Sequence, residues 1–223
     1  MDTPKINKNG FLLSAFGDLS TLSALVDSEG FDVQATDGNG RNAIHLSARA
    51  GHDNCVSFLI EKGVDPNIQD KDGLTPLMHA TNAGKESTAN LIISKGGDCN
   101  ISDNIGNNCM HGATARGILG LVQAIQGAGG DHNVENKAKV RPIHVAARSG
   151  QIVILRHYLK GGVEVDAQDN AGNTALHIAS MCGFHLLCKA LIEANADAGI
   201  TNSAGKSAKD LCMNEDTKAV FAA

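Results

Sequence analysis

The stretch GLTPLMHA at residues 73–80 decides the fold, because it returns in closely similar form as GNTALHIA at residues 172–179. The two copies begin 99 residues apart, which is three times a period of 33 that other positions share. One column in steps of 33 consists of Gly51, Gly84, Gly117, Gly150 and Gly183. Several columns that stay in phase indicate an internal repeat, in which each copy is one supersecondary structure.

Each 33-residue repeat predicts a turn followed by two short helices. Side chains that cap helix N-termini occupy one column: Asn42, Thr75, Asn108, Thr174 and Ser207. Pro76 and Pro142 follow in the first helical position, where a missing N–H is harmless. An apolar column, a small-residue column and a terminal glycine complete the pattern. Because one repeat cannot bury its apolar face alone, neighbouring repeats must stack.

The 33-residue period and the pattern G-x-T-P-L-H-x-A-A resemble the ankyrin-repeat family. The resemblance implies an all-α solenoid of helix-turn-helix repeats joined by β-hairpin-like turns. We expect one domain over residues 1–223, with an N-terminal cap at 1–36 and a C-terminal cap at 202–223. Between them lie five full repeats, at 37–69, 70–102, 103–135, 136–168 and 169–201. We interpret the degenerate ends as caps of a complete stack, with a fragment of a larger chain as the alternative.

Three departures from the family pattern are informative. Met78 takes the place of the expected histidine, and His79 follows one position later. Lys139 stands where a glycine normally adopts a positive φ, which is unfavourable for a residue with a Cβ atom. Gly120 and Gly127 fall near or within a second helix, which they weaken by about 1 kcal/mol each. We therefore predict that repeats 3 and 4 are the least stable, which uniform amide-exchange protection would contradict.

Composition restricts the function classes. The 223 residues carry a net charge of -5, which gives no general attraction to nucleic acid or to acidic membranes. No apolar run approaches the roughly 18 residues of a transmembrane helix, and the polar N-terminus does not resemble a signal peptide. We expect a monomer in the cytoplasm, with the nucleus as a further location, and six reduced cysteines.

No catalytic residue, cofactor or metal site is expected. Four of the nine histidines share one repeat column, and the resemblance implies that their imidazoles bind turn backbone: His45, His111, His144 and His177. The recurring aspartates, such as Asp70, favour turn formation rather than paired acid–base chemistry. Among the cysteines, Cys182 is expected to be exposed. A third column matches positions that asparaginyl hydroxylases modify in some ankyrin repeats, with a turn role as the alternative: Asn67, Asn100 and Asn133.

The resemblance places a partner protein on a concave face lined by turn tips and first helices. The candidate contact residues in those columns are Arg41, Arg49, Lys71, Leu74, Ile105, Arg116, Lys137, Val140, Arg148 and Met181. When Asp72, Lys139, Arg141 and Lys206 are included, the charged positions are nine basic and one acidic. This excess indicates a groove for an acidic partner segment. The alternative is that these are solvated surface charges.

The sequence thus predicts a protein-binding adaptor, scaffold or inhibitor. Length and repeat number are also similar to gankyrin-like proteasome assembly chaperones, which hold a proteasomal ATPase subunit. An enzyme is disfavoured, because no nucleophile, base and orienting group converge in the sequence. Binding of nucleic acid is disfavoured by the negative net charge and by the absence of interleaved aromatic residues.

Overall fold

The computed structural model describes residues 3–28 and 30–222, in which helices alternate with turns. No β-strand occurs in this part of the chain, and Thr201 and Ser207 form an isolated antiparallel bridge. The helices are α1 (Thr3–Phe16), α2 (Leu19–Ser28), α3 (Ala43–Ala50), α4 (Asp53–Glu61), α5 (Pro76–Asn82), α6 (Glu86–Ser94), α7 (Cys109–Arg116), α8 (Leu119–Gly127), α9 (Pro142–Arg148), α10 (Ile152–Lys160), α11 (Ala175–Met181), α12 (His185–Glu193), the 3-10 helix η1 (Lys209–Leu211) and α13 (Glu215–Val220).

The helices follow the period of the sequence. The first helix of each repeat begins at residue 43, 76, 109, 142 or 175, in steps of 33. A second helix follows each of them within the same repeat. The predicted all-α helix-turn-helix solenoid is therefore confirmed.

The chain divides into two compact units. The first compact unit is Met1–Asn104 with Gln123–Gly130, and the second is Ile105–Val122 with Asp131–Ala223. Helix α8 contributes its beginning to the second unit and its end to the first. Each of the two units has its own buried interior.

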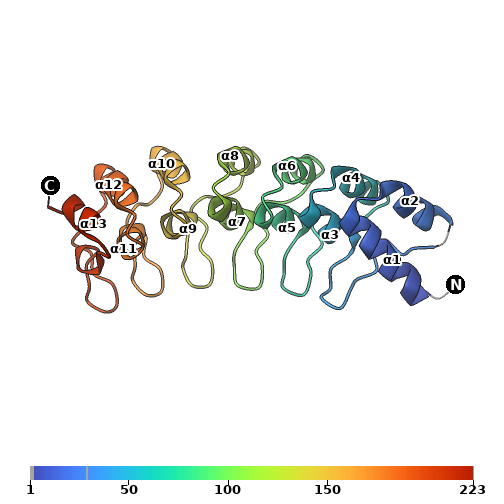
Figure 1. Cartoon of the computed structure of the whole chain (residues 1–223), viewed down its shortest axis with the longest axis horizontal. Coiled ribbons are helices and arrows are strands. Elements are labelled where there is room, and N and C mark those ends of the chain that lie inside the picture. Colours follow the sequence, from blue (N-terminus) through green and yellow to red (C-terminus); the bar gives the residue numbers. More distant parts are fainter. Residues whose placement is uncertain (1–2, 29, 223) are drawn as a thin grey trace. The chain divides into compact units, whose positions relative to one another are not determined.

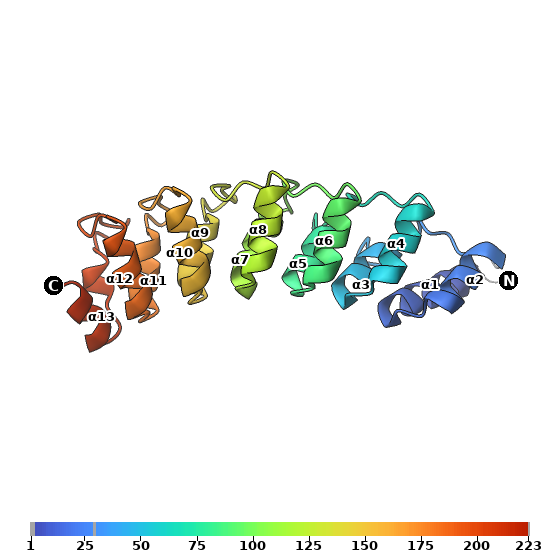
Figure 2. The ribbon, with the colours of Figure 1, turned by 90° about the horizontal axis from the view of Figure 1, so that it is seen from above.

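In the first compact unit, α1, α3 and α5 form one layer and α2, α4 and α6 form the next (Figure 1). Helix α4 packs against α3, and α6 packs against α5, as the view from above also shows (Figure 2). Their shared interior contains five large buried side chains: Leu22, Ile44, Leu59, Leu77 and Ile92. Burying each such side chain contributes about 1.5–3 kcal/mol, so the interlayer contact stabilises this unit.

The second compact unit repeats this arrangement, with α9 and α11 packed together and α10 and α12 lying against them. The side chains of Ile143, Leu155 and Leu176 are buried there. Tyr158 is also buried, and its hydroxyl shares a hydrogen bond with the hydroxyl of Thr114. The phenol ring is therefore packed in the interior while its hydroxyl is hydrogen-bonded, and burial raises the pKa of Tyr158.

The hairpin turns are held by one side chain each. The carboxylate of Asp70 accepts hydrogen bonds from the amides of Asp72 (3.0 Å) and Leu74 (2.9 Å). Asn136 keeps the same role in the fourth repeat, where its Oδ1 accepts from Ala138 N (2.8 Å) and Val140 N (3.0 Å). The turn is thus preserved although its sequence departs from the family pattern.

Neighbouring turn tips are joined by backbone hydrogen bonds. In each bond the amide of the second turn residue donates to the carbonyl of the third turn residue in the preceding repeat. In the first compact unit the pairs are Lys71 to Asn39 (3.0 Å) and Asn104 to Asp72 (2.9 Å). In the second they are Lys137 to Ile105 (3.0 Å), Asn170 to Ala138 (3.0 Å) and Ser203 to Ala171 (2.9 Å). We call this series the tip ladder.

Two residues with side chains adopt the left-handed conformation. Lys139 has φ 56° and Asn195 has φ 63°, each in a column that glycine occupies in the other repeats. The prediction that Lys139 is forced to a positive φ is therefore confirmed. Such a conformation is unfavourable by about 1–3 kcal/mol for a non-glycine residue.

The two ends of the described chain depart from the repeat pattern in different ways. Helix α1 begins at Thr3 and has 14 residues, whereas the first helices of the five full repeats have 7 or 8. Ser207 does not start an α-helix: its hydroxyl bonds the Asp210 carboxylate (2.8 Å), and only the short η1 follows. The C-terminal segment then forms α13, whose N-cap is Asn214.

Candidate protein-binding surface

Four of the predicted contact residues lie in the first compact unit. Lys71 is exposed in a turn and its Nζ donates to the carbonyl of Gly38 (2.8 Å). Arg49 is exposed in the last turn of α3. Leu74 is half-buried, and its carbonyl lies 3.2 Å from His45 Nε2. These side chains therefore present both charge and some apolar surface.

The other six predicted contact residues lie in the second compact unit. Ile105 stands at a turn tip with 61% of its surface exposed, and Lys137 is exposed in the following turn. Arg148 and Met181 are exposed at the ends of α9 and α11. Two further positions complete the set, the exposed Arg116 and the half-buried Val140.

The basic excess is smaller than the sequence indicates. Arg41 is half-buried, and its Nε and Nη2 donate to Asp37 Oδ2 at 3.0 and 2.7 Å. Arg141 likewise binds the carboxylates of Glu135 and Glu164. Because both guanidinium groups are neutralised within the fold, neither offers a full charge to a partner. Among the predicted contact residues, Arg41 is therefore the least suited to act as a charged contact.

The histidine column is structural, as predicted. The Nε2 atom of His144 lies 2.8 Å from the carbonyl of Ala167, and that of His177 lies 3.1 Å from the carbonyl of Lys206. His45 bridges the carbonyls of Ile68 (3.1 Å) and Leu74 (3.2 Å) in the same way. These rings connect first helices to turns, so they are engaged in holding the fold.

Burial keeps these imidazoles neutral. It lowers the pKa of His45 to about 4, with a further contribution from the neighbouring His79 ring. Burial also lowers the pKa of His144 and of His177. Because neutral imidazole accepts at one nitrogen and donates at the other, it suits the two-sided bonding observed.

The displaced histidine of the second repeat has its own partner. His79 Nε2 lies 2.8 Å from Asp70 Oδ2, and both side chains are buried. The His79 ring also stands edge-on to His45, with centroids 5.3 Å apart. Burial lowers the pKa of His79 although Asp70 acts in the opposite direction. The pair fixes the turn and has no nucleophile within its hydrogen bonds.

The remaining candidates are placed as follows. Asn67 Nδ2 donates to Gly96 O (3.0 Å), and Asn67 Oδ1 accepts from Asp98 N (2.8 Å). The side chain therefore has a structural role in the turns. Hydroxylation of that column stays a prediction. Cys182 is exposed at the end of α11, as expected, and all six cysteines are free thiols.

Two kinds of feature are absent from the residues that the structure describes. Among them, no three His, Cys, Asp or Glu side chains are grouped so as to hold a metal ion. None of the helices in residues 3–28 and 30–222 has the length and apolar character needed to cross a membrane.

One exposed feature of the second compact unit was not predicted. Val153 and Leu186 occupy the same repeat column and are each more than half exposed. In the first compact unit that column holds the polar Asn54 and Ser87. Comparison of these positions between repeats would have revealed the change, whereas the sequence argument considered only turn tips and first-helix ends.

Comparisons with known proteins agree with this architecture. A family model described as "Ankyrin repeats (3 copies)" matches residues 11–103 and 110–202. The human ASB11 ankyrin repeat domain superposes with a TM-score of 0.87 at 23% identity, covering 96% of each chain. The ankyrin repeat domain of Bcl-3, described as a unique member of the IkappaB protein family, gives 0.81 at 20% identity over 96% of this chain and 97% of its own. No curated protein sequence matches the chain. Since the family model covers well over half of its residues, the chain belongs to the ankyrin-repeat family.

Proposed function

We propose that the protein is a non-enzymatic adaptor, scaffold or inhibitor that binds an acidic segment of a partner protein. Ankyrin-repeat folds are generally protein–protein interaction modules, and the buried histidines and satisfied turn aspartates described above serve the fold. The proposed contact surface is formed by the hairpin turns and the ends of the first helices, which is the concave face expected of an ankyrin stack. We further propose that the protein acts as a monomer in the cytoplasm or nucleus.

The observation that supports this function is a separation between exposed cations and occupied carboxylates. In the second compact unit Arg148 and Lys137 are exposed. In contrast, Asp169 Oδ1 accepts two backbone amides of its own turn, each at 2.9 Å. The carboxylate of Asp169 is thus directed to backbone amides, while Arg148 and Lys137 are exposed, as are Ile105 and Met181. Such a surface would attract and orient an acidic segment.

Charge reversal tests the proposal. The partner is first isolated from the native source by affinity purification and mass spectrometry, and its affinity is then measured by calorimetry. We expect the triple variant Arg49→Glu, Arg116→Glu, Arg148→Glu to lose binding. A control with the same change in net charge at second-helix ends is Lys62→Glu, Lys95→Glu, Lys160→Glu, which should bind as the wild type does. Wild-type affinity in the first variant would reject the surface.

The same purification separates a general adaptor from a gankyrin-like chaperone. The length and repeat number of this chain are similar to those of gankyrin-like chaperones, which supports the chaperone function. Such proteins hold a proteasomal ATPase subunit. Recovery of that subunit as the main partner would support the narrower function. Recovery of a different partner would reject it and leave the general proposal in place.

A further inference from the structure

The start of the second helix differs between the repeats of the two compact units. The residue before each second helix and the first two residues of that helix are here called a corner. In the first compact unit they read HDN at 52–54 and KES at 85–87. In the second they read ILG at 118–120, QIV at 151–153 and FHL at 184–186. Since polar corners support the same helix pairs, the fold does not require apolar residues there.

Two apolar corner residues, Val153 and Leu186, are open to solvent. Val153 is 57% exposed and Leu186 is 52% exposed, and they sit one repeat apart on the packed helices α10 and α12. Met213 is 72% exposed and follows the next turn, with its Cβ close to where a Gly183 side chain would lie. Contiguous exposed apolar groups of this kind mark interaction sites in soluble proteins.

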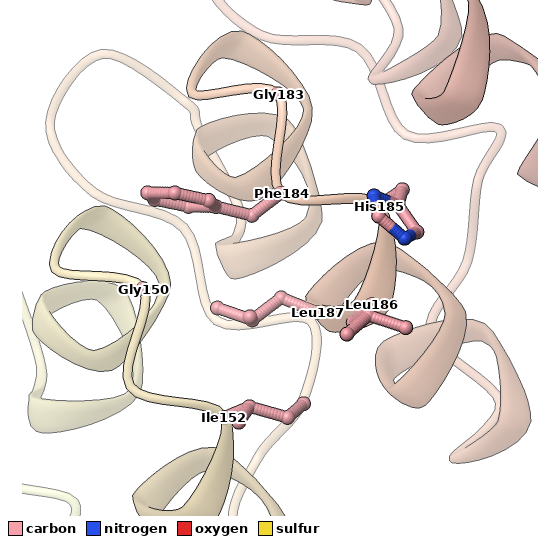
Figure 3. A pocket seen from close by; sticks show the side chains of 7 residues that line it. All are labelled: Gly150, Ile152, Gly183, Phe184, His185, Leu186 and Leu187. Carbon is pink, nitrogen blue, oxygen red and sulfur yellow. The ribbon is translucent and has the colours of Figure 1, made fainter.

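A pocket of about 330 Å³ lies between the last two corners. The side chains of Ile152 and Leu187 point into the space between these corners (Figure 3). The Phe184 ring lies over Gly150, where an added Cβ would be only 3.1 Å from ring atom Cζ. The pocket is therefore walled by apolar side chains and can accept an apolar side chain from outside.

The charged side chains on the helices that carry these corners are mostly basic. The helices α7 to α12 carry five basic side chains and one acidic side chain, Glu193. That carboxylate lies 4.0 Å from Lys189 and at the far end of α12. Arg148 and Arg156 stand on either side of the pocket-lining segment 150–152. In the first compact unit, α3 to α6 carry one basic side chain and three acidic side chains, so the basic excess among these helices belongs to the second unit.

The corner backbone offers little to an incoming strand. The amides of Ile152, Phe184 and Leu187 already donate to carbonyls of their own chain, each at 3.0 Å. Addition of a strand relies on unpaired backbone groups, whereas a helix in a groove relies on side chains. Residues i and i+7 of a helix are about 10.5 Å apart, close to the roughly 8–10 Å between packed helices. One apolar side chain per corner is thus compatible with a helical ligand.

We propose that the corners at 151–153 and 184–186 of the second compact unit form a docking strip for an acidic amphipathic helix of a partner protein. Apolar side chains of that helix at i and i+7 enter neighbouring corners, and its carboxylates face Arg148, Arg156 and Lys189. The proposal deepens the function proposed above, since it rests on the chain being a protein-binding module and adds a second contact surface.

The test uses a synthetic amphipathic helical peptide with leucine at every seventh position and glutamate on the flanking faces. Titration into ¹⁵N-labelled full-length protein should shift the amide signals of Gly150, Gly183 and Leu186. The double variant Val153→Glu, Leu186→Glu should weaken binding by roughly tenfold or more, because two buried apolar contacts are lost. The matched control Asn54→Glu lies in the same repeat column of the first compact unit and should bind like the wild type.

Three results would overturn the docking strip. They are wild-type affinity in the double variant, equal binding of a peptide whose glutamates are replaced by lysine, and signal shifts confined to residues outside the corners. Binding of the natural partner to the two sets of variants distinguishes the docking strip from the proposed function. If it is released by the charge reversals at the first-helix ends but held normally by Val153→Glu, Leu186→Glu, the proposed function stands and the strip is rejected.

Discussion

Replacing Asn42 by threonine tests how the first helices satisfy their buried polar atoms. The Nδ2 group of Asn42 is buried without a hydrogen-bond partner, and so is that of Asn108. Because the Asn42 amide N–H donates to His45 Nδ1 (3.1 Å), that nitrogen is an acceptor. Asn42 Oδ1 lies 2.8 Å from the same nitrogen, so two acceptors face each other. Turning the side-chain amide over relieves this contact but moves the oxygen to the position that has no partner.

Threonine avoids the conflict, as the fifth repeat shows. Thr174 Oγ1 lies 2.8 Å from His177 Nδ1 and also accepts from the His177 amide (3.4 Å). A hydroxyl can donate to the ring while accepting from the helix, which a fixed amide oxygen cannot do. The backbone of Asn42 is extended, with φ -96° and ψ -177°, close to the φ -85° and ψ 171° of Thr174. The substitution therefore needs no backbone change.

The expected gain follows from these contacts. An unsatisfied buried donor destabilises a protein by about 1–3 kcal/mol. Threonine is a slightly poorer N-cap than asparagine, which offsets a few tenths of a kcal/mol. We expect Asn42→Thr to raise the free energy of unfolding by about 1 kcal/mol, and Asn108→Thr to add a similar amount because the two sites are independent.

Urea unfolding followed by circular dichroism measures the difference. The reverse change Thr174→Asn serves as the control and should lower stability by about 1 kcal/mol. If Asn42→Thr is no more stable than the wild type while Thr174→Asn is neutral, the reasoning about the buried amide is wrong.

Two further predictions concern pH and backbone strain. The free energy of unfolding should fall as pH drops from 6.5 to about 4, because unfolded His45 binds a proton in this range that the folded form does not bind. The full pKa shift corresponds to about 3 kcal/mol, and urea midpoints that are constant across this range would contradict it. Lys139→Gly should raise the free energy of unfolding by about 1 kcal/mol, since φ 56° suits glycine. The matched change Gly172→Lys should lower the free energy of unfolding. If both variants have the thermal midpoint of the wild type, the assignment of strain is refuted.

The parts of the fold that repeat could be predicted from the sequence, and those that occur once could not. Columns such as Thr75 and Gly150 appear in several copies, so each prediction of a cap or a helix end had independent support. Helix α1 has no such copies, and Gly10 lies within it. That glycine is required because the Phe31 ring lies against it, where an added Cβ would be 2.2 Å from a ring atom. Only the fold brings Phe31 to that position.

The candidate site was predicted less completely, for a related reason. Repeat position alone, at a turn tip for Ile105 and at a first-helix end for Arg148, indicated that both are exposed, and they are. The neutralisation of Arg141 depends on Glu164, which is 23 residues away and approaches only when turns stack. The exposed Leu186 was overlooked because helix periodicity assigns most leucines to the interior. Ion pairs and exposed apolar groups depend on tertiary neighbours, which a single sequence does not show.

The tip ladder has a consequence for how recognition can evolve. Its amides and carbonyls are already paired between neighbouring turns, so an approaching protein meets only the side chains. Asn39, Asp72 and Ile105 occupy the same position on this shared backbone and differ fully in chemistry. Single substitutions at this position can therefore change the binding preference, while the hydrogen bonds on which the turns depend stay formed.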